Sequence, residues 1–282
     1  MPPGPHPPPG PPSPPPPSSP GIVRLDFFSA TITTNNLGGL GPCADPTSPC
    51  PDEPHEIVYE GIGNFQGRDI DLHVRNTTAY DVNNANRNGK DKGEFGNINM
   101  RQDRKTFLEF CFKDHNSTNY TILNEFAFTF YDFDQPKHRL FEETLFANPS
   151  EFYEYTTTDQ DPNHDIETEL VVRNATTPNG WMAFESSTVG IGDDNPTTPD
   201  LQDLTDPLRD QQLARSVSFY FFDRACFNIA FGVVRPGAPA AAIPRAHAAP
   251  PHTLLFASRA RECPQHTYAR VMLRGMLFSA DH

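Results

Sequence analysis

Apolar and polar residues alternate with a period of two through many short segments of this chain. Ile70, Leu72 and Val74 alternate with charged neighbours, and the same pattern recurs at 107–112, 125–131 and 217–221. This period places successive side chains on opposite faces of a β-strand. The rings of 22 Phe and 8 Tyr also favour the pleated surface of a sheet. Turn-forming clusters at 35–39 and 86–89 separate such runs, so we predict an all-β fold, an antiparallel β-sandwich of jelly-roll-like type.

Further strands are predicted at 23–33, 56–61, 169–173, 181–185 and 226–234. One short helix is also expected. Asp206 can cap its N-terminus, Pro207 suits the first helical position, and residues 208–214 follow.

Composition divides the chain into three regions. Residues 1–20 include 13 prolines, which predicts a leader that behaves as a polyproline II spacer or a disordered linker. Residues 21–234 carry the strand signals and form the predicted sandwich. Residues 235–282 are rich in Ala, Pro and Arg. They are interpreted as a disordered tail or as sequence that is not naturally coding, without an assigned fold, and a short amphipathic helix is considered only at 271–278.

The overall charge and hydropathy exclude some partners. A formal net charge of -14 argues against nucleic acid, because phosphate binding needs clustered Lys and Arg. No apolar run is long enough to span a membrane. The opening Met1-Pro2-Pro3-Gly4 shows no apolar signal segment, so an extracellular interpretation assumes a start that lies further upstream.

Four sequons for N-glycosylation favour that extracellular interpretation. They begin at Asn76, Asn116, Asn119 and Asn174, each in a predicted loop or at a predicted strand end.

The five cysteines point the same way. Cys43 and Cys50 bracket a short loop that a disulfide would close, and Cys111 and Cys226 lie in predicted strands, where we expect a bond between the two sheets. Two buried free thiols are the alternative for the second pair, and the spacing does not favour zinc.

Acidic residues suggest a calcium site. Asp132 and Asp134 are two apart, so on a strand both carboxylates would face one side, and Glu143 follows. A second acidic stretch contains Asp193 and Asp194. Calcium is therefore a candidate cofactor, and a solvated strand end is the alternative.

Exposed aromatic rings suggest sugar binding. Trp181 and Tyr131 are the main candidates for stacking on a sugar ring, with Tyr153 and Tyr155 beside them, although a ring on a strand more often packs in the core. No nucleophile elbow, zinc-protease motif or phosphate loop is present, so no catalytic residue is assigned and an enzyme is the less favoured class.

Three stretches, 29–42, 128–134 and 216–219, resemble secreted modules in large proteins of unicellular algae, over residues 22–234. The run Pro11-Pro12-Ser13-Pro14, continued by further prolines, resembles the hydroxyproline-rich leaders of algal wall glycoproteins such as pherophorins. The resemblance implies a secreted or cell-surface location and no particular activity.

Together these features predict an extracellular matrix or cell-surface glycoprotein module with a structural or adhesive role. Its expected partners are cell-wall or matrix glycans and glycoproteins. A calcium-dependent carbohydrate-binding module and a glycan-acting enzyme are the two alternatives.

Overall fold

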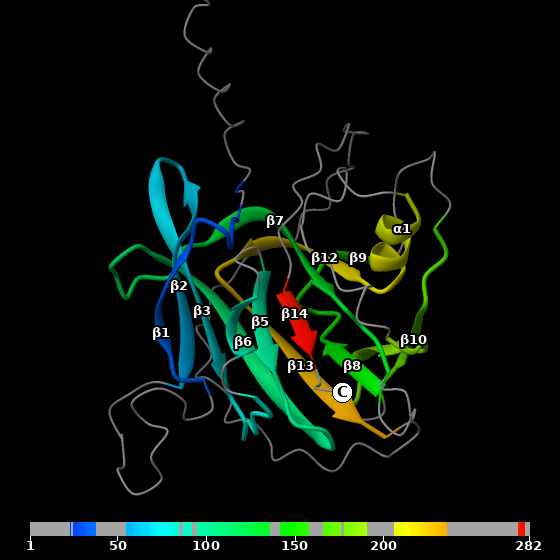
Figure 1. Ribbon diagram of the computed structural model, residues 1–282. Coiled ribbons are helices and arrows are strands. Elements are labelled where there is room, and N and C mark those ends of the chain that lie inside the picture. The colour runs from blue at the N-terminus through cyan, green and yellow to red at the C-terminus, as the bar shows by residue number, and fades with distance from the viewer. Residues whose placement is uncertain are drawn as a thin grey trace, which may run out of the picture.

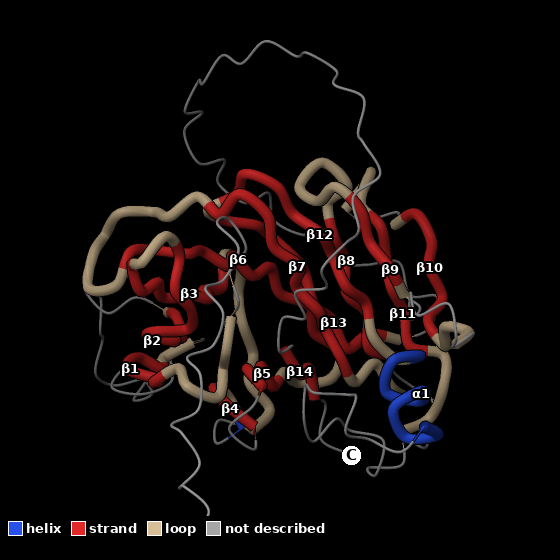
Figure 2. Tube along the Cα trace, turned by 90° about the horizontal axis from the view of Figure 1, so that it is seen from above, coloured by secondary structure: helices blue, strands red, loops and turns tan. Residues whose placement is uncertain are grey.

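Two β-sheets pack face to face in the computed structural model (Figures 1 and 2). The structure describes residues 23, 25–37, 55–84, 87–91, 95–135, 142–157, 166–175, 178–190, 206–235 and 276–279. Within them the protein is mostly β, with antiparallel sheets and one short helix, as the alternating pattern predicted.

The larger sheet has eight strands in the order β1-β2-β3-β6-β13-β8-β11-β10, and all its neighbouring pairs are antiparallel. The strands are β1 (Thr31–Asn35), β2 (Glu56–Phe65), β3 (Arg68–Asn76), β6 (Arg104–Asp114), β8 (Glu142–Ala147), β10 (Leu170–Asn174), β11 (Met182–Ser186) and β13 (Cys226–Val234).

The smaller sheet has six strands in the order β4-β5-β14-β7-β12-β9. They are β4 (Gly89–Asp91), β5 (Phe95–Asn99), β7 (Leu123–Tyr131), β9 (Glu154–Thr156), β12 (Val217–Arg224) and β14 (Met276–Ser279). β14 runs parallel to both β5 and β7, so the helix expected at 271–278 is wrong at these positions. The strand supplies backbone partners to β5 and β7, a long-range pairing that local periodicity does not reveal.

Aromatic side chains from both sheets fill the core. Phe110 of β6 and Phe227 of β13 stack with their centroids 4.9 Å apart, and Phe128 of β7 lies 5.5 Å from Phe110 across the sandwich. All three rings are fully buried, and each buried ring of this kind contributes roughly 1.5–3 kcal/mol. The predicted alternation of β3, β6 and β12 is thus confirmed, with the apolar residues facing inward. β13 is the buried strand that was expected, whereas β7 is buried on both faces from Phe126 onward and does not alternate in burial.

The strand expected at 23–33 is a turn for part of its length. Asp26 accepts hydrogen bonds from the Phe28 backbone N–H (3.0 Å) and from the Ser29 hydroxyl (2.8 Å). An aspartate that bonds locally in this way favours a turn over a strand, so β1 begins only at Thr31.

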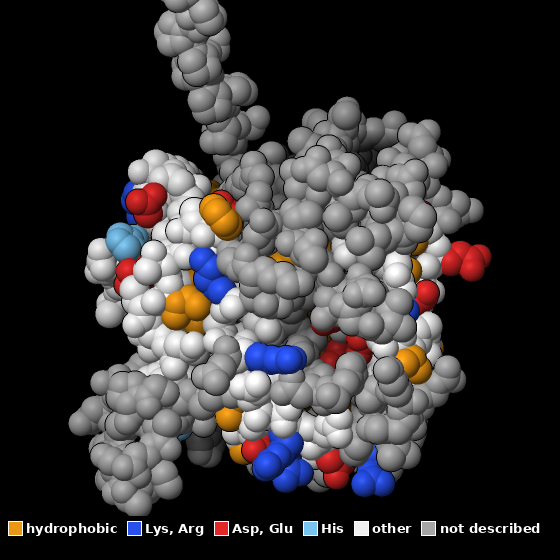
Figure 3. Space-filling model, in the orientation of Figure 1, with side chains coloured by type: hydrophobic (Ala, Val, Ile, Leu, Met, Phe, Trp, Pro, Cys, Tyr) orange, Lys and Arg blue, Asp and Glu red, His pale blue; other side chains and the backbone are white. Residues whose placement is uncertain are grey.

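The expected helix is confirmed as α1 (Asp206–Ala214). No helix among the described residues is long and apolar enough to cross a membrane. On the face shown in Figure 3, the described hydrophobic side chains form separate small spots between polar and charged ones.

Candidate functional site

The outer face of the eight-stranded sheet carries charged, polar and aromatic side chains. Strand β6 alternates four buried residues with outward residues, so one row of its side chains points away from the core. The outward row consists of Lys105, Phe107, Glu109, Cys111 and Lys113.

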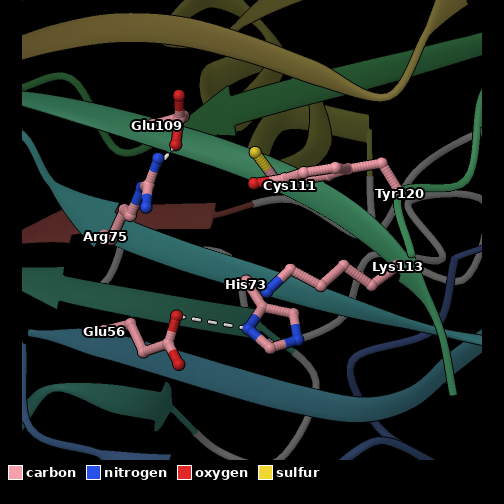
Figure 4. A pocket seen from close by; sticks show the side chains of 7 residues that line it. All are labelled: Glu56, His73, Arg75, Glu109, Cys111, Lys113 and Tyr120. Atoms are coloured by element: carbon pink, nitrogen blue, oxygen red, sulfur yellow. Dashed lines mark hydrogen bonds and ion pairs between the residues drawn. The ribbon is translucent and has the colours of Figure 1, made fainter. Parts of the chain in front are cut away.

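One end of this face holds a small, open polar hollow (Figure 4). Three neighbouring strands build it, because the register places Glu56 opposite Arg75, Arg75 opposite Glu109, and His73 opposite Cys111. Its lining residues are Glu56, His73, Arg75, Glu109, Cys111, Lys113 and Tyr120.

Two polar pairs form across the strands inside the hollow. Nδ1 of His73 lies 3.2 Å from Oε2 of Glu56, and Nε of Arg75 donates to Oε2 of Glu109. Burial alone would raise the pKa of Glu56, but the hydrogen bond and charge of His73, with smaller effects of Lys113 and Arg75, lower it below its ordinary value. Glu56 therefore stays ionised and holds the imidazole in place.

Tyr120 closes the hollow on one side. Its side chain is 54% exposed, and Nζ of Lys113 lies 5.7 Å from the centre of its ring. The hollow is shallow and open, with room for about one water molecule, so it suits one polar group of a larger partner.

A half-buried aromatic pair continues the same face. The rings of Phe107 and Trp181 meet edge to face with centroids 5.3 Å apart. They lie over a small outer cluster formed by Phe146, Ala175, Ala183 and Ala230.

Lys105 belongs to this apolar part of the face. Its Nζ is 4.1 Å from the centre of the Phe146 ring. Burial lowers the pKa of Lys105 to about 8.

The two sugar-binding candidates thus have different surroundings. Trp181 lies on the outer face, half-buried beside Phe107. Tyr131 is only 3% exposed and packs edge to face on Phe95, at 5.8 Å. Tyr155 also packs inward, on Phe184, whereas Tyr153 is 71% exposed.

The acidic residues predicted to bind calcium do not lie on one strand. Asp132 and Asp134 follow β7 in an irregular segment, where Asp132 has a positive φ of 70°. They are 8% and 6% exposed, so they are not the solvated strand end that was the alternative. Glu143 lies within β8, 2% exposed, and its backbone N–H donates to the Ser186 hydroxyl at 2.9 Å.

The carboxylate of Asp134 packs directly against Gly190. A Cβ atom at position 190 would lie 1.8 Å from Oδ2 of Asp134, so only glycine fits there. Gly190 precedes the stretch that contains Asp193 and Asp194, which lie outside the described residues. No group of three metal-binding side chains converges among the residues described, and calcium binding stays a prediction.

Cys111 and Cys226 form a disulfide on this outer face. They lie directly opposite each other on the neighbouring strands β6 and β13, with Cα atoms 4.2 Å apart. The expected link between the two sheets is therefore wrong, because both strands belong to the eight-stranded sheet. The predicted Cys43–Cys50 pair lies outside the described residues.

The sequons differ in accessibility. Asn116 and Asn119 are exposed in the turn after β6, and Asn174 is exposed at the end of the edge strand β10. Asn76 ends β3 half-buried, and its Nδ2 donates to the Thr78 carbonyl at 2.8 Å. Glycosylation at these positions stays a prediction.

The ionic groups of the hollow were not predicted as a site. Alternation in β3 and β6 indicates which side chains face outward. The pairing of Glu56 with His73 and of Arg75 with Glu109 depends on strand register, which the sequence does not show.

No family model and no curated protein matches this sequence. Among solved structures, the N-terminal domain of the Streptococcus gordonii adhesin Sgo0707 is similar, with 10% identity, a TM-score of 0.37, and coverage of 62% of this chain and 42% of that one. The adhesin domain of PrgB from Enterococcus faecalis, solved bound to DNA, has 13% identity, a TM-score of 0.33, and coverage of 63% and 59%. This chain thus aligns with less than two thirds of either structure, and the likeness to these surface adhesins is distant. The resemblance to algal modules stays a prediction.

Proposed function

We propose that this protein is an extracellular adhesive module that binds an extended glycan across the outer face of its eight-stranded sheet. One observation carries the proposal: β6 points both Phe107 and Glu109 outward. The aromatic pair Phe107–Trp181 and the polar hollow therefore form one continuous surface.

The chemistry of this surface suits an oligosaccharide. Aromatic rings stack on the apolar faces of sugars, and paired charged side chains exchange hydrogen bonds with hydroxyl groups. A ligand that spans the pair and the hollow would contact several sugar units, which fits a surface without a deep pocket. The Cys111–Cys226 disulfide supports an extracellular location, since such bonds persist in oxidising compartments.

Trp181 is the only tryptophan of the chain, so its fluorescence reports on this face. Titration of the full chain with the sugars selected from a glycan array should change the emission of Trp181. On the glycan array, Trp181→Ala should weaken binding about tenfold or more, as for an aromatic anchor at a contact centre. Arg75→Gln should weaken it as well, because the hollow would lose a charged donor.

Phe28→Ala is the matched control, because Phe28 is 61% exposed and lies outside this face. Equal binding by the wild type, Trp181→Ala and Arg75→Gln would refute the proposal that the outer face contacts the glycan. An array without any binding sugar would refute the glycan as partner.

Calcium dependence is a second proposal, and a separate observation favours it. Asp134 packs against Gly190, so the segment after β7 lies at the start of the second acidic stretch. Oxygen ligands from two such segments suit calcium. Calorimetric titration of the chelator-treated full chain with CaCl₂ should then give heat that Asp134→Asn abolishes. No heat with the wild type would refute the calcium site and leave the glycan proposal intact.

A further inference from the structure

An exposed aromatic pair lies on the other sheet. Tyr153 is 71% exposed and Phe222 of β12 is 41% exposed. Their rings meet at 84° with centroids 5.1 Å apart, so they form an open corner. The preceding Phe152 and the neighbouring Phe221 point into the core, which leaves Tyr153 and Phe222 on the solvent side.

Backbone and side-chain contacts hold this corner in place. The Tyr153 N–H donates to the Tyr220 carbonyl at 2.8 Å. Phe152 packs 5.0 Å from Phe219, and Nη2 of Arg224 donates to the Ser150 carbonyl at 2.8 Å. The corner is therefore organised before any partner binds, which reduces the entropy lost on binding.

The surrounding charges indicate what kind of partner fits. Glu125 lies opposite Phe222 on β7, and Glu154 follows Tyr153; both are exposed. Carboxylates beside the rings disfavour an acidic partner. An uncharged partner with many ring-containing side chains would pack on the two aromatic rings without electrostatic repulsion.

The chain itself contains a segment of that chemistry. Residues 1–20 include 13 prolines and no Lys, Arg, Asp or Glu. Proline-rich segments bind aromatic surfaces because the pyrrolidine rings stack on them and the fixed φ leaves little entropy to lose. The phenol of Tyr153 adds a hydrogen-bond donor for a proline carbonyl.

We propose that Tyr153 and Phe222 form a docking corner for the proline-rich leader, residues 1–20, of a second copy of this chain. A proline-rich segment acts as a semi-rigid spacer, and this favours contact with a neighbour over return to its own domain. The contact links copies into an assembly and lies on a different sheet from the glycan-binding face.

Sedimentation velocity of the full chain over a range of concentrations tests the proposal. Self-association should occur, and Tyr153→Ala or Phe222→Ala should weaken it about tenfold, as for a central aromatic contact. A synthetic peptide of residues 1–20 should compete with it. Replacing Pro14, Pro15, Pro16 and Pro17 by Ser in the full chain should abolish it.

Tyr120→Ala is the matched control, since Tyr120 is another exposed tyrosine, 54% exposed, and lies beside β6 of the other sheet. It should associate like the wild type. Unchanged urea midpoints for all variants show that the fold is intact. A monomeric full chain at every concentration, association that survives Tyr153→Ala, or a peptide that does not compete would each overturn the proposal. Glycan binding by Tyr153→Ala and Phe222→Ala shows separately whether the proposed function holds.

Discussion

Removal of the Cys111–Cys226 disulfide should cost a large part of the stability of this protein. The bond joins residues separated by 115 positions, and closing a loop of that length gives about 4.8 kcal/mol at 25 °C in the chain-entropy relation. The double variant Cys111→Ala/Cys226→Ala loses this restraint on the unfolded chain while the neighbouring β6–β13 pairs remain.

Urea unfolding followed by circular dichroism measures the loss. With a slope of about 2.5 kcal/mol/M, a loss of about 4.8 kcal/mol lowers the midpoint by roughly 2 M. Reductant should shift the wild type towards the variant and change the variant far less. Non-reducing peptide mapping should recover Cys111 and Cys226 in one linked peptide pair.

A midpoint lowered by less than about 0.5 M would refute the reasoning, because a loss near 1 kcal/mol is what two simple cysteine replacements cost. Separate, unlinked Cys111 and Cys226 peptides from the folded protein would refute the bond itself.

Three further predictions concern the core and two titrating groups. Phe128→Ala should lower the unfolding free energy by about 3–5 kcal/mol in urea, because its buried ring contacts Phe110 and Phe227, and a loss below 1 kcal/mol would contradict this packing. The hydrogen bond and charge of Asp71 raise the pKa of His115, whose Nδ1 lies 2.9 Å from Oδ1 of Asp71. The interaction of His115 with Asp71 should therefore stabilise the fold fully below the ordinary histidine pKa of about 6.5. This contribution should be lost as the pH rises through the raised pKa of His115. Amide exchange at Asn116 should then accelerate with rising pH beyond its intrinsic pH dependence, and His115→Gln should abolish this extra rise. Burial, with a smaller effect of Glu185, raises the pKa of Glu142 to about 7. At pH values above the ordinary glutamate pKa of about 4.3, the buried carboxyl therefore lowers the stability of the fold. Glu142→Gln should raise the urea midpoint at pH 8 and leave it unchanged at pH 4, and equal shifts at both values would contradict the buried carboxylate.

Local sequence determined the strands whose faces differ in polarity. In β3 and β6 every second residue is apolar, and only a strand with one buried face satisfies that pattern. The start of α1 was likewise predictable, because the signals for it, an Asp followed by a Pro, lie in adjacent residues. β8 was missed, since all six of its residues are buried and no alternation marks it.

Only the tertiary structure decided which strands are neighbours. β6 lies beside β13, so the cysteines pair within one sheet, and the short β14 joins β5 and β7 from far along the chain. The pairing of β2 with β3 and of β3 with β6 gathers Glu56, His73 and Arg75 into the hollow. The packing of the two sheets buries Tyr131, while Trp181 stays half-buried on the outer face. The sequence determines which side of a strand is apolar because that depends on neighbouring residues. It leaves the strand order open because backbone hydrogen bonds between distant strands are nearly the same for any partner.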